Sequence, residues 1–142
     1  MRVVVDTNVL VSGLLSSRGA PARIVDAVLE GWLVPLASRA TLAELKHVLA
    51  RPRLARWFQR AGHDPQAFLS DYCALAIGLE PPPSPLHIRD EKDRPFMELA
   101  QAAPPGTVLV SGDQDIHAVA GAQFRAMTPA RFVAEFIADK AR

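Results

Sequence analysis

Four acidic residues stand where predicted strands or helices begin or end: Asp6, Glu44, Asp93 and Asp113. Asp6 closes a run of three valines, and Asp113 follows the apolar run 108–110 after one serine and one glycine. Ligands of open α/β sheets bind at the carboxyl ends of parallel strands, where we expect both of these aspartates. The placement therefore predicts that the four carboxylates form a metal site.

A cluster of carboxylates favours a hard divalent cation. Several carboxylates within a few ångströms cannot all ionise without a compensating cation, and oxygen ligands suit Mg²⁺ or Mn²⁺. Zinc is disfavoured, because the single cysteine, Cys73, is isolated and the histidines form no pair at ligand spacing. Glu44 and His47 match half of a di-iron helix motif, but the sequence lacks the second copy that such a site needs.

Each of these residues also has an ordinary structural explanation. Glu44 is the fourth residue of a capping box that would begin at Thr41, and Asp93 and Asp115 would each cap a helix or turn. Asp6 is the hardest to explain in this way, because an unpaired charge beside a buried strand is costly. Cys73 lies among apolar residues and is interpreted as a buried structural thiol.

A second pattern consists of cations. Residues 46–60 contain one lysine and four arginines without an acid, interleaved with Trp57 and Phe58. Arginines that bind phosphates and a tryptophan that stacks on bases would suit a nucleic acid. The alternative is a solvated helix face whose arginine stems cover the aromatic rings. The candidate nucleic-acid contacts are Arg51, Arg53, Arg56, Trp57 and Arg60.

Length and composition predict one domain, residues 1–142. A chain of 142 residues that is 49% hydrophobic can bury a core of its own. Its apolar stretches are all shorter than the roughly 18 residues of a membrane span, and we recognise no cleavable leader. We therefore expect a cytoplasmic protein with no membrane partner. The net charge of +1 does not by itself mark the chain as a nucleic-acid binder.

Hydrophobic periodicity predicts strands that alternate with helices. Strands are expected at residues 2–6, 33–37, 107–111 and 124–127. Complete helices are expected at residues 8–15, 38–50 and 64–77. Further helices are expected to begin at residues 21, 93 and 128, and a basic helical stretch after Pro52 is expected to reach residue 61. Residues 80–85 contain four prolines and are expected to form an extended connector. The alternation predicts an α/β fold with a central, mainly parallel sheet of four to five strands, covered by helices on both faces.

The acidic strings resemble those of the PIN-domain ribonucleases, and more closely those of the PIN toxins of bacterial toxin–antitoxin pairs. Residues 5–10 (VDTNVL) resemble the first strand and first acid of the family, and residues 41–45 (TLAEL) resemble its second acidic helix. Residues 111–115 (SGDQD) are similar to its closing acidic turn. The order and spacing of the strings match along nearly the whole chain. The resemblance implies a PIN-like α/β/α sandwich.

The resemblance also implies a metal-dependent endoribonuclease that hydrolyses phosphodiester bonds in single-stranded RNA. Asp6 and Asp113 would bind the principal Mg²⁺ or Mn²⁺, while Glu44 and Asp93 would hold a second ion or its waters. The supporting residues would be Asn8, Ser111 and Asp115, of which Asp115 is either a ligand or an outer partner. The implied partners are the RNA substrate, a small antitoxin protein and a second copy of the chain in a homodimer.

One position departs from the family pattern. Close relatives have two successive aspartates before an aromatic residue or leucine, whereas this chain has Asp93, Arg94, Pro95 and Phe96. Either Asp93 or Asp90 supplies the third carboxylate, or the site has three acids and reduced activity. If Arg94 has weakened the site, Arg94→Asp should raise activity.

Two other functions fit parts of the sequence. A non-catalytic RNA-binding module would keep the fold while Arg94 spoils the metal site. An aspartyl-phosphate phosphatase would use an aspartate at a strand end as its nucleophile. That chemistry needs a second acid two residues after the first, and this chain has Asn8 there.

Overall fold

The centre of the molecule is a five-stranded sheet, shown by a computed structural model that describes residues 1–138. Every pair of neighbouring strands is parallel, and the order across the sheet is β3-β2-β1-β4-β5. The strands are β1 (Arg2–Val5), β2 (Val34–Ala37), β3 (Ile77–Gly78), β4 (Val108–Val110) and β5 (Arg125–Met127). These findings confirm the predicted α/β fold with a parallel sheet.

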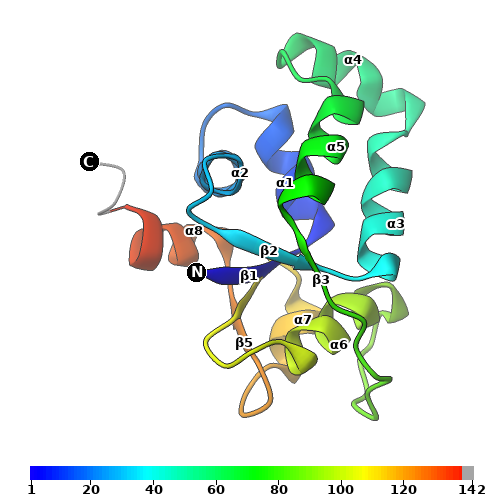
Figure 1. Ribbon diagram of the computed structural model, residues 1–142, viewed down its shortest axis with the longest axis vertical. Coiled ribbons are helices and arrows are strands. Elements are labelled where there is room, and N and C mark those ends of the chain that lie inside the picture. The colour runs from blue at the N-terminus through cyan, green and yellow to red at the C-terminus, as the bar shows by residue number, and fades with distance from the viewer. Residues whose placement is uncertain (139–142) are drawn as a thin grey trace.

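Helices cover both faces of the sheet, so the molecule has three layers (Figure 1). One layer contains α1 (Thr7–Leu15), α2 (Ala20–Leu29), α5 (Pro65–Leu75) and α8 (Pro129–Phe132), which continues into the π-helix η2 (Val133–Ile137). The other layer contains α6 (Arg94–Ala102), which follows the 3-10 helix η1 (Glu91–Asp93), and α7 (Gln114–Val119). At one end stand α3 (Arg39–Leu49) and α4 (Pro52–Arg60).

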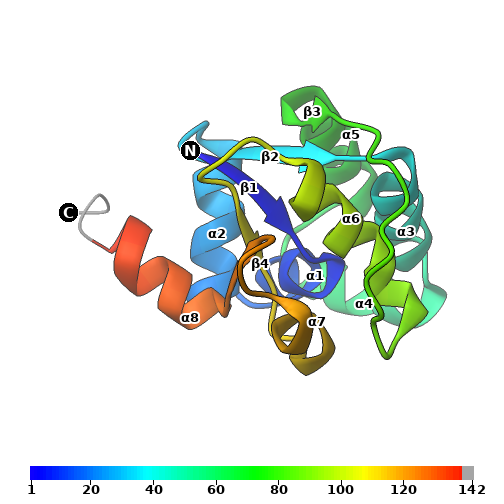
Figure 2. The ribbon, with the colours of Figure 1, turned by 90° about the horizontal axis from the view of Figure 1, so that it is seen from below.

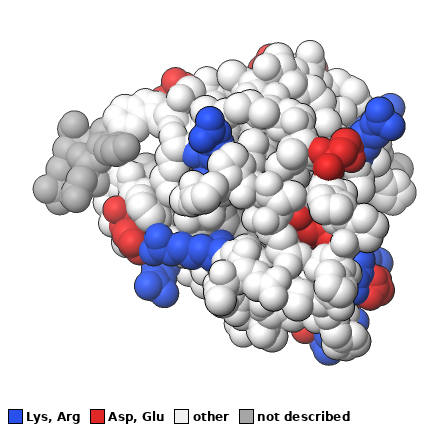
Figure 3. Space-filling view, turned by 60° about the horizontal axis from the view of Figure 1, so that its bottom comes forward, with Lys and Arg blue, Asp and Glu red and all other residues white. Residues whose placement is uncertain are grey.

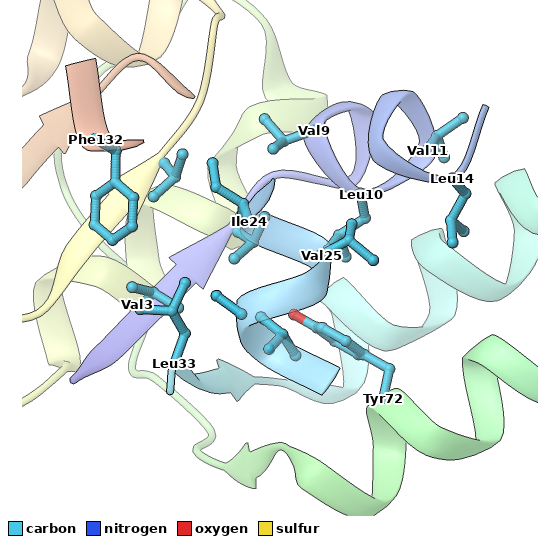
Figure 4. Close-up of a cluster of buried hydrophobic side chains, with 14 of the residues drawn as sticks. Val3, Val9, Leu10, Val11, Leu14, Ile24, Val25, Leu33, Tyr72 and Phe132 are labelled. Atoms are coloured by element: carbon cyan, nitrogen blue, oxygen red, sulfur yellow. The ribbon is translucent and has the colours of Figure 1, made fainter. Parts of the chain in front are cut away.

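The alternation of side chains in β1 separates two hydrophobic clusters. Val3 and Val5 pack in the larger cluster with residues of α1, α2, α5 and α8, part of which is drawn in Figure 4. Val4 points to the other face and packs in the smaller cluster with residues of α6 and α7. Successive side chains of a strand point to opposite faces, so a strand of consecutive valines requires cover on both sides.

Two local predictions are wrong. The helix expected at residues 64–77 ends at Leu75, and Ile77 and Gly78 instead form β3, where Ile77 pairs with Leu36 of β2. A strand of two residues depends on its partner strand, and local periodicity cannot reveal that partner. Cys73, expected to be buried, is exposed.

The chain crosses from one half of the sheet to the other between β3 and β4. β1 lies between β2 and β4, although β2 and β3 separate it from β4 in the sequence. The carboxyl ends of β1 and β4 therefore meet at the switch point of the sheet, which is the usual ligand site of such folds. Figure 2 shows the end of β1 leading into α1, with α6 and α7 close by. Within residues 1–138, we find no helix long and apolar enough to span a membrane.

Candidate functional site

Asp6 lies at the end of β1, where its carboxylate is held from two sides. The residue is only 5% exposed. Ser111 Oγ donates a hydrogen bond to Asp6 Oδ2 at 2.7 Å, and the Asn8 amide donates to Asp6 Oδ1 at 3.4 Å. Burial raises the pKa of Asp6, and these hydrogen bonds oppose the rise. Asp6 is therefore a buried carboxyl group whose orientation is fixed by Ser111, which directly follows the neighbouring strand β4, and by the first turn of α1.

Asp113 lies beside Asp6, at the end of β4. Ser111 joins the two residues, because its hydroxyl donates to Asp6 and also accepts the Asp113 amide N–H at 3.0 Å. Asp113 Oδ1 accepts the Asp115 amide N–H at 2.8 Å and so caps α7. The charge of Asp113 adds to the rise in the pKa of Asp6. The sequence-based interpretation of Asp115 as the cap is therefore wrong, since Asp113 occupies that position.

Glu44 reaches the same end of the sheet from α3. Thr7 Oγ1 donates a hydrogen bond to Glu44 Oε2 at 3.1 Å. Burial is the largest cause that raises the pKa of Glu44, the Thr7 bond opposes it, and the charge of Asp6 adds to it. The capping-box interpretation of Glu44 is wrong, because that box is formed by Ser38 and Thr41.

Asp93 is the last residue of η1 and is 8% exposed. Its pKa is raised to about 7, first by burial and then by the hydrogen bond to Asp113 and the charge of Asp113. The charges of Asp6 and Asp90 add smaller contributions. Asp93 precedes α6, yet its side chain makes no capping hydrogen bond, so its interpretation as a plain N-cap is wrong. Its side chain faces the other acids instead.

The contact between Asp93 and Asp113 tests whether these residues fit a cation. Asp93 Oδ2 is buried and accepts no hydrogen bond from any donor within residues 1–138. Two carboxylates in contact repel each other when both are ionised, and a shared proton or a bound cation removes this repulsion. The raised pKa of Asp93 corresponds to the shared proton. The alternative is a divalent ion that takes oxygen ligands, and the carboxylate oxygens present here suit such an ion.

Asp93 also belongs to a second group of acids. Asp90, Asp93 and Asp115 each place a carboxylate oxygen within 4.8 Å of the others, which makes this cluster a candidate metal site. Asp90 Oδ1 accepts the Lys92 amide N–H at 3.0 Å. Arg89 Nε pairs with Asp115 Oδ1 at 2.8 Å. Asp93 therefore interacts with Asp6 and Asp113 and also belongs to the cluster with Asp90 and Asp115.

The sequence model of the PIN domain family matches residues 2–115, which include β1, α3, η1 and the turn after β4. The chain belongs to the PIN domain family. An uncharacterized protein of Methanocaldococcus jannaschii is 24% identical to it over 147 residues, which cover 96% of this chain and 92% of that protein. No solved structure gave a significant match.

PIN domains are typically metal-dependent nucleases, and this PIN domain brings several carboxylates together at one edge of its sheet. Figure 3 shows one group of acidic atoms set back between uncharged atoms near the middle of the view, while other acidic atoms stand at the surface near Lys and Arg atoms. Two cations lie close enough to affect these acids, because the charges of Arg51 and Lys92 both lower the pKa of Glu44. The supporting residue Asn8 is exposed, and its main-chain N–H contacts Asp6.

The predicted RNA contacts of this PIN domain lie on α4 and just before it. Arg53, Arg56 and Arg60 are exposed, and Trp57 is 52% exposed. The Arg60 guanidinium lies 5.1 Å from the centre of the Trp57 ring. Phe58 is fully buried, so Trp57 lies at the surface while Phe58 packs in the core. Of these candidate RNA contacts, Arg51 interacts with an acid of the site, because its charge lowers the pKa of Glu44.

Sequence reasoning missed several residues around the acids. Thr7 orients Glu44 through a hydrogen bond that joins residues 37 positions apart. His117 Nε2 lies 2.6 Å from the Ser111 carbonyl oxygen, and Arg89 pairs with Asp115. Thr7 had a sequence signal, because it directly follows an acid at a strand end. Arg89 and His117 had none, since their partners are set by the packing of the turn.

Proposed function

We propose that this PIN domain is a metal-dependent endoribonuclease that hydrolyses phosphodiester bonds in single-stranded RNA. The observation that carries the proposal is the contact of Asp93 with Asp113, next to Asp6. A buried oxygen without a donor lies there, at the switch point of the sheet. Buried polar atoms are rarely left without a partner, so an unpaired carboxylate among other acids favours a cation.

Different acids would hold the principal ion and the second ion. Asp6 and Asp113 would bind the principal Mg²⁺ or Mn²⁺, while Glu44 and Asp93 would hold a second ion or its waters. When bound, the metal would activate water as the nucleophile and stabilise the charge that develops on the phosphate. Ser111 keeps the Asp6 carboxylate aimed at the site through its hydrogen bond. Asp115 serves either as a ligand or as an outer partner.

The RNA would lie along α4 and the residue before it. Arg51, Arg53 and Arg56 would bind backbone phosphates, because arginine presents several donors to a phosphate. Trp57 and Arg60 would offer a stacking surface for a base, since they already form a cation–π pair with each other. Arg51 would join this surface to the acids, where it interacts with Glu44.

The biological setting is the second part of the proposal. The resemblance of residues 5–10, 41–45 and 111–115 to PIN toxins supports a toxin of a toxin–antitoxin pair, consisting of one domain over residues 1–142. Such a protein would act in the cytoplasm, bind a small antitoxin protein and form a homodimer. Copurification of a small protein encoded beside this chain would support this part, and an active monomer without such a partner would contradict it.

The test of the nuclease is cleavage of a labelled single-stranded RNA by the purified protein. We expect cleavage with Mg²⁺ or Mn²⁺, none with chelator, and none with Asp113→Asn. The matched control is Asp26→Asn, because Asp26 is exposed on α2 and outside the acid group. Cleavage that persists in chelator would contradict the metal-dependent reaction.

The structure gives less support to the non-catalytic RNA-binding module. That alternative required Arg94 to spoil the metal site, whereas the Arg94 guanidinium binds Glu91 and the carbonyl oxygens of Ser84 and Leu86. Calorimetry with Mn²⁺ separates the two functions. RNA binding without Mn²⁺ binding would favour the module.

A further inference from the structure

Arg94, the residue that departs from the family pattern, is bound to the proline-rich connector. Its Nη1 donates to the Ser84 carbonyl oxygen at 3.1 Å, and its Nη2 donates to the Leu86 carbonyl oxygen at 3.1 Å. The same guanidinium forms two hydrogen bonds with the Glu91 carboxylate, at 2.6 and 3.1 Å. Arg94 therefore joins the connector, η1 and the start of α6 through one planar group.

Glu98 completes this arrangement one helical turn later. The Ser84 amide N–H donates to Glu98 Oε2 at 2.6 Å, so residues of α6 bind both main-chain polar groups of Ser84. Ser84 is the only residue between positions 81 and 85 that has an amide N–H, because the others are prolines. The connector thus has few amide donors of its own, and the one at Ser84 is bound by Glu98 of α6.

The anchored connector leads directly to the acids. After Leu86, the side chain of Ile88 is 1% exposed and packs in the smaller hydrophobic cluster with residues of α6. The next two residues reach the site, because Arg89 pairs with Asp115 and Asp90 caps η1. The segment from Ser84 to Asp93 is therefore held at its beginning by Arg94 and Glu98 and ends in the acid cluster.

We propose that Arg94 and Glu98 are positioning residues that hold this segment so that Asp90 and Asp93 face Asp113 and Asp115. The proposal rests on the nuclease function, which it deepens by assigning a role to residues that do not touch the reacting atoms. The forked guanidinium suits this role better than an ammonium group, because a lysine has a single nitrogen and cannot bind two carbonyl oxygens and a carboxylate in the same geometry. Outer partners of metal ligands commonly set metal affinity in this way.

This assignment reverses one expectation from the sequence. The family pattern suggested that Arg94→Asp would restore an acid and raise activity. In the structure, an aspartate at this position would lose the bonds to Ser84 and Leu86 and would place a negative charge beside Glu91. We therefore expect Arg94→Asp to weaken metal binding.

The experiment compares Mn²⁺ affinity and cleavage in Arg94→Gln, Arg94→Lys and the wild type. We expect calorimetry to show Mn²⁺ binding that is roughly 10–100-fold weaker in Arg94→Gln and intermediate in Arg94→Lys. Cleavage should recover at saturating Mn²⁺, which a general loss of folded protein would not allow. Arg131→Gln, which changes an exposed arginine of α8, should match the wild type. An unchanged Mn²⁺ affinity in both Arg94 variants would overturn the proposal.

Hydrogen exchange supplies a readout that does not depend on the nuclease. The amides of Ser84 and Leu86 should exchange faster in Arg94→Gln than in the wild type, while amides of β1 and β4 keep their protection. Unchanged exchange at Ser84 and Leu86 would also overturn the proposal. If the wild type neither binds Mn²⁺ nor cleaves RNA, the proposed function fails, and the exchange experiment still decides whether Arg94 holds the connector.

Discussion

Four acids of this PIN domain come from two regions that are built differently. In the first, which we call the strand half, Asp6 and Asp113 follow β1 and β4, and Ser111 joins them by hydrogen bonds. In the second, the turn half, Asp90 and Asp93 belong to a 3-10 turn and the residue before it. The positions of the acids in the strand half are set by the buried sheet. The positions of those in the turn half depend on Arg94 and Glu98, which bind the proline-rich connector.

The two regions also differ in how their oxygens are satisfied. Both carboxylate oxygens of Asp6 accept hydrogen bonds from neighbouring residues. Asp93 Oδ2 accepts none within residues 1–138, and the pKa of Asp93 is raised to about 7. The comparison indicates that the strand half is preorganised without an ion, while the turn half is completed by a proton or by a cation.

The largest effect should come from breaking the strand half with Asp6→Asn. We expect cleavage to fall by more than about 100-fold, beyond the loss typical of outer partners, because a direct ligand is removed. The melting temperature should not fall, since the change removes a buried charge while an amide oxygen still accepts the Ser111 hydrogen bond. Cleavage at saturating Mn²⁺ and thermal unfolding measure the two effects. Residual activity close to the wild type would show that Asp6 is not a ligand.

A smaller effect should follow from Ser111→Ala, which leaves the strand acids in place but unsupported. Ser111 is fully buried, and its loss removes the donor to Asp6 and the acceptor of the Asp113 amide. We expect roughly 10–100-fold weaker activity and a stability loss of about 1–3 kcal/mol from the unpaired groups. Ser70→Ala, on the exposed side of α5, is the control. Equal activity in the two variants would contradict the supporting role of Ser111.

The turn half can be tested by pH in the absence of metal. Because the pKa of Asp93 is about 7 in the folded protein and about 4 in the unfolded chain, the folded state keeps a proton that the unfolded state has lost. Stability should therefore fall as pH rises from about 4 to about 7. Asp93→Asn should flatten this fall, which thermal unfolding in chelator measures between pH 5 and 8.

Two controls sharpen the pH comparison. Asp26→Asn, on the surface of α2, should keep the slope of the wild type. Mn²⁺ should raise the melting temperature more at pH 8 than at pH 5, because at the lower pH the ion must displace a proton from Asp93. A slope that is the same in Asp93→Asn and in the wild type would show that the turn half does not hold this proton.

The smallest effect should come from α4, outside both halves. Arg56→Gln removes one exposed cation from the proposed RNA surface. We expect a several-fold weaker affinity for single-stranded RNA and a salt dependence whose slope is lower by about 1, with turnover of bound RNA unchanged. Binding titrations at several salt concentrations measure this change, with Arg131→Gln as the control. An unchanged slope would place the RNA on another surface.

The sequence allowed much of the fold to be predicted because its signals are local. Three valines in succession predicted a strand buried on both faces, and Val3, Val4 and Val5 divide between two clusters in the structure. The predicted parallel sheet is confirmed, with one more strand than those located by periodicity. β3 was missed because Ile77 and Gly78 are extended through pairing with β2, a contact about 40 residues away in sequence.

For the candidate site, the sequence by itself determined where two acids stand. Asp6 and Asp113 follow strands, and parallel strands bring their carboxyl ends to one edge, so the fold class places both acids at that edge. Tertiary structure decided the rest. The bond of Thr7 to Glu44, the contact of Asp93 with Asp113 and the attachment of Arg94 to the connector all join distant segments. Only the packing of those segments sets which donor an acid meets, and no local pattern contains that information.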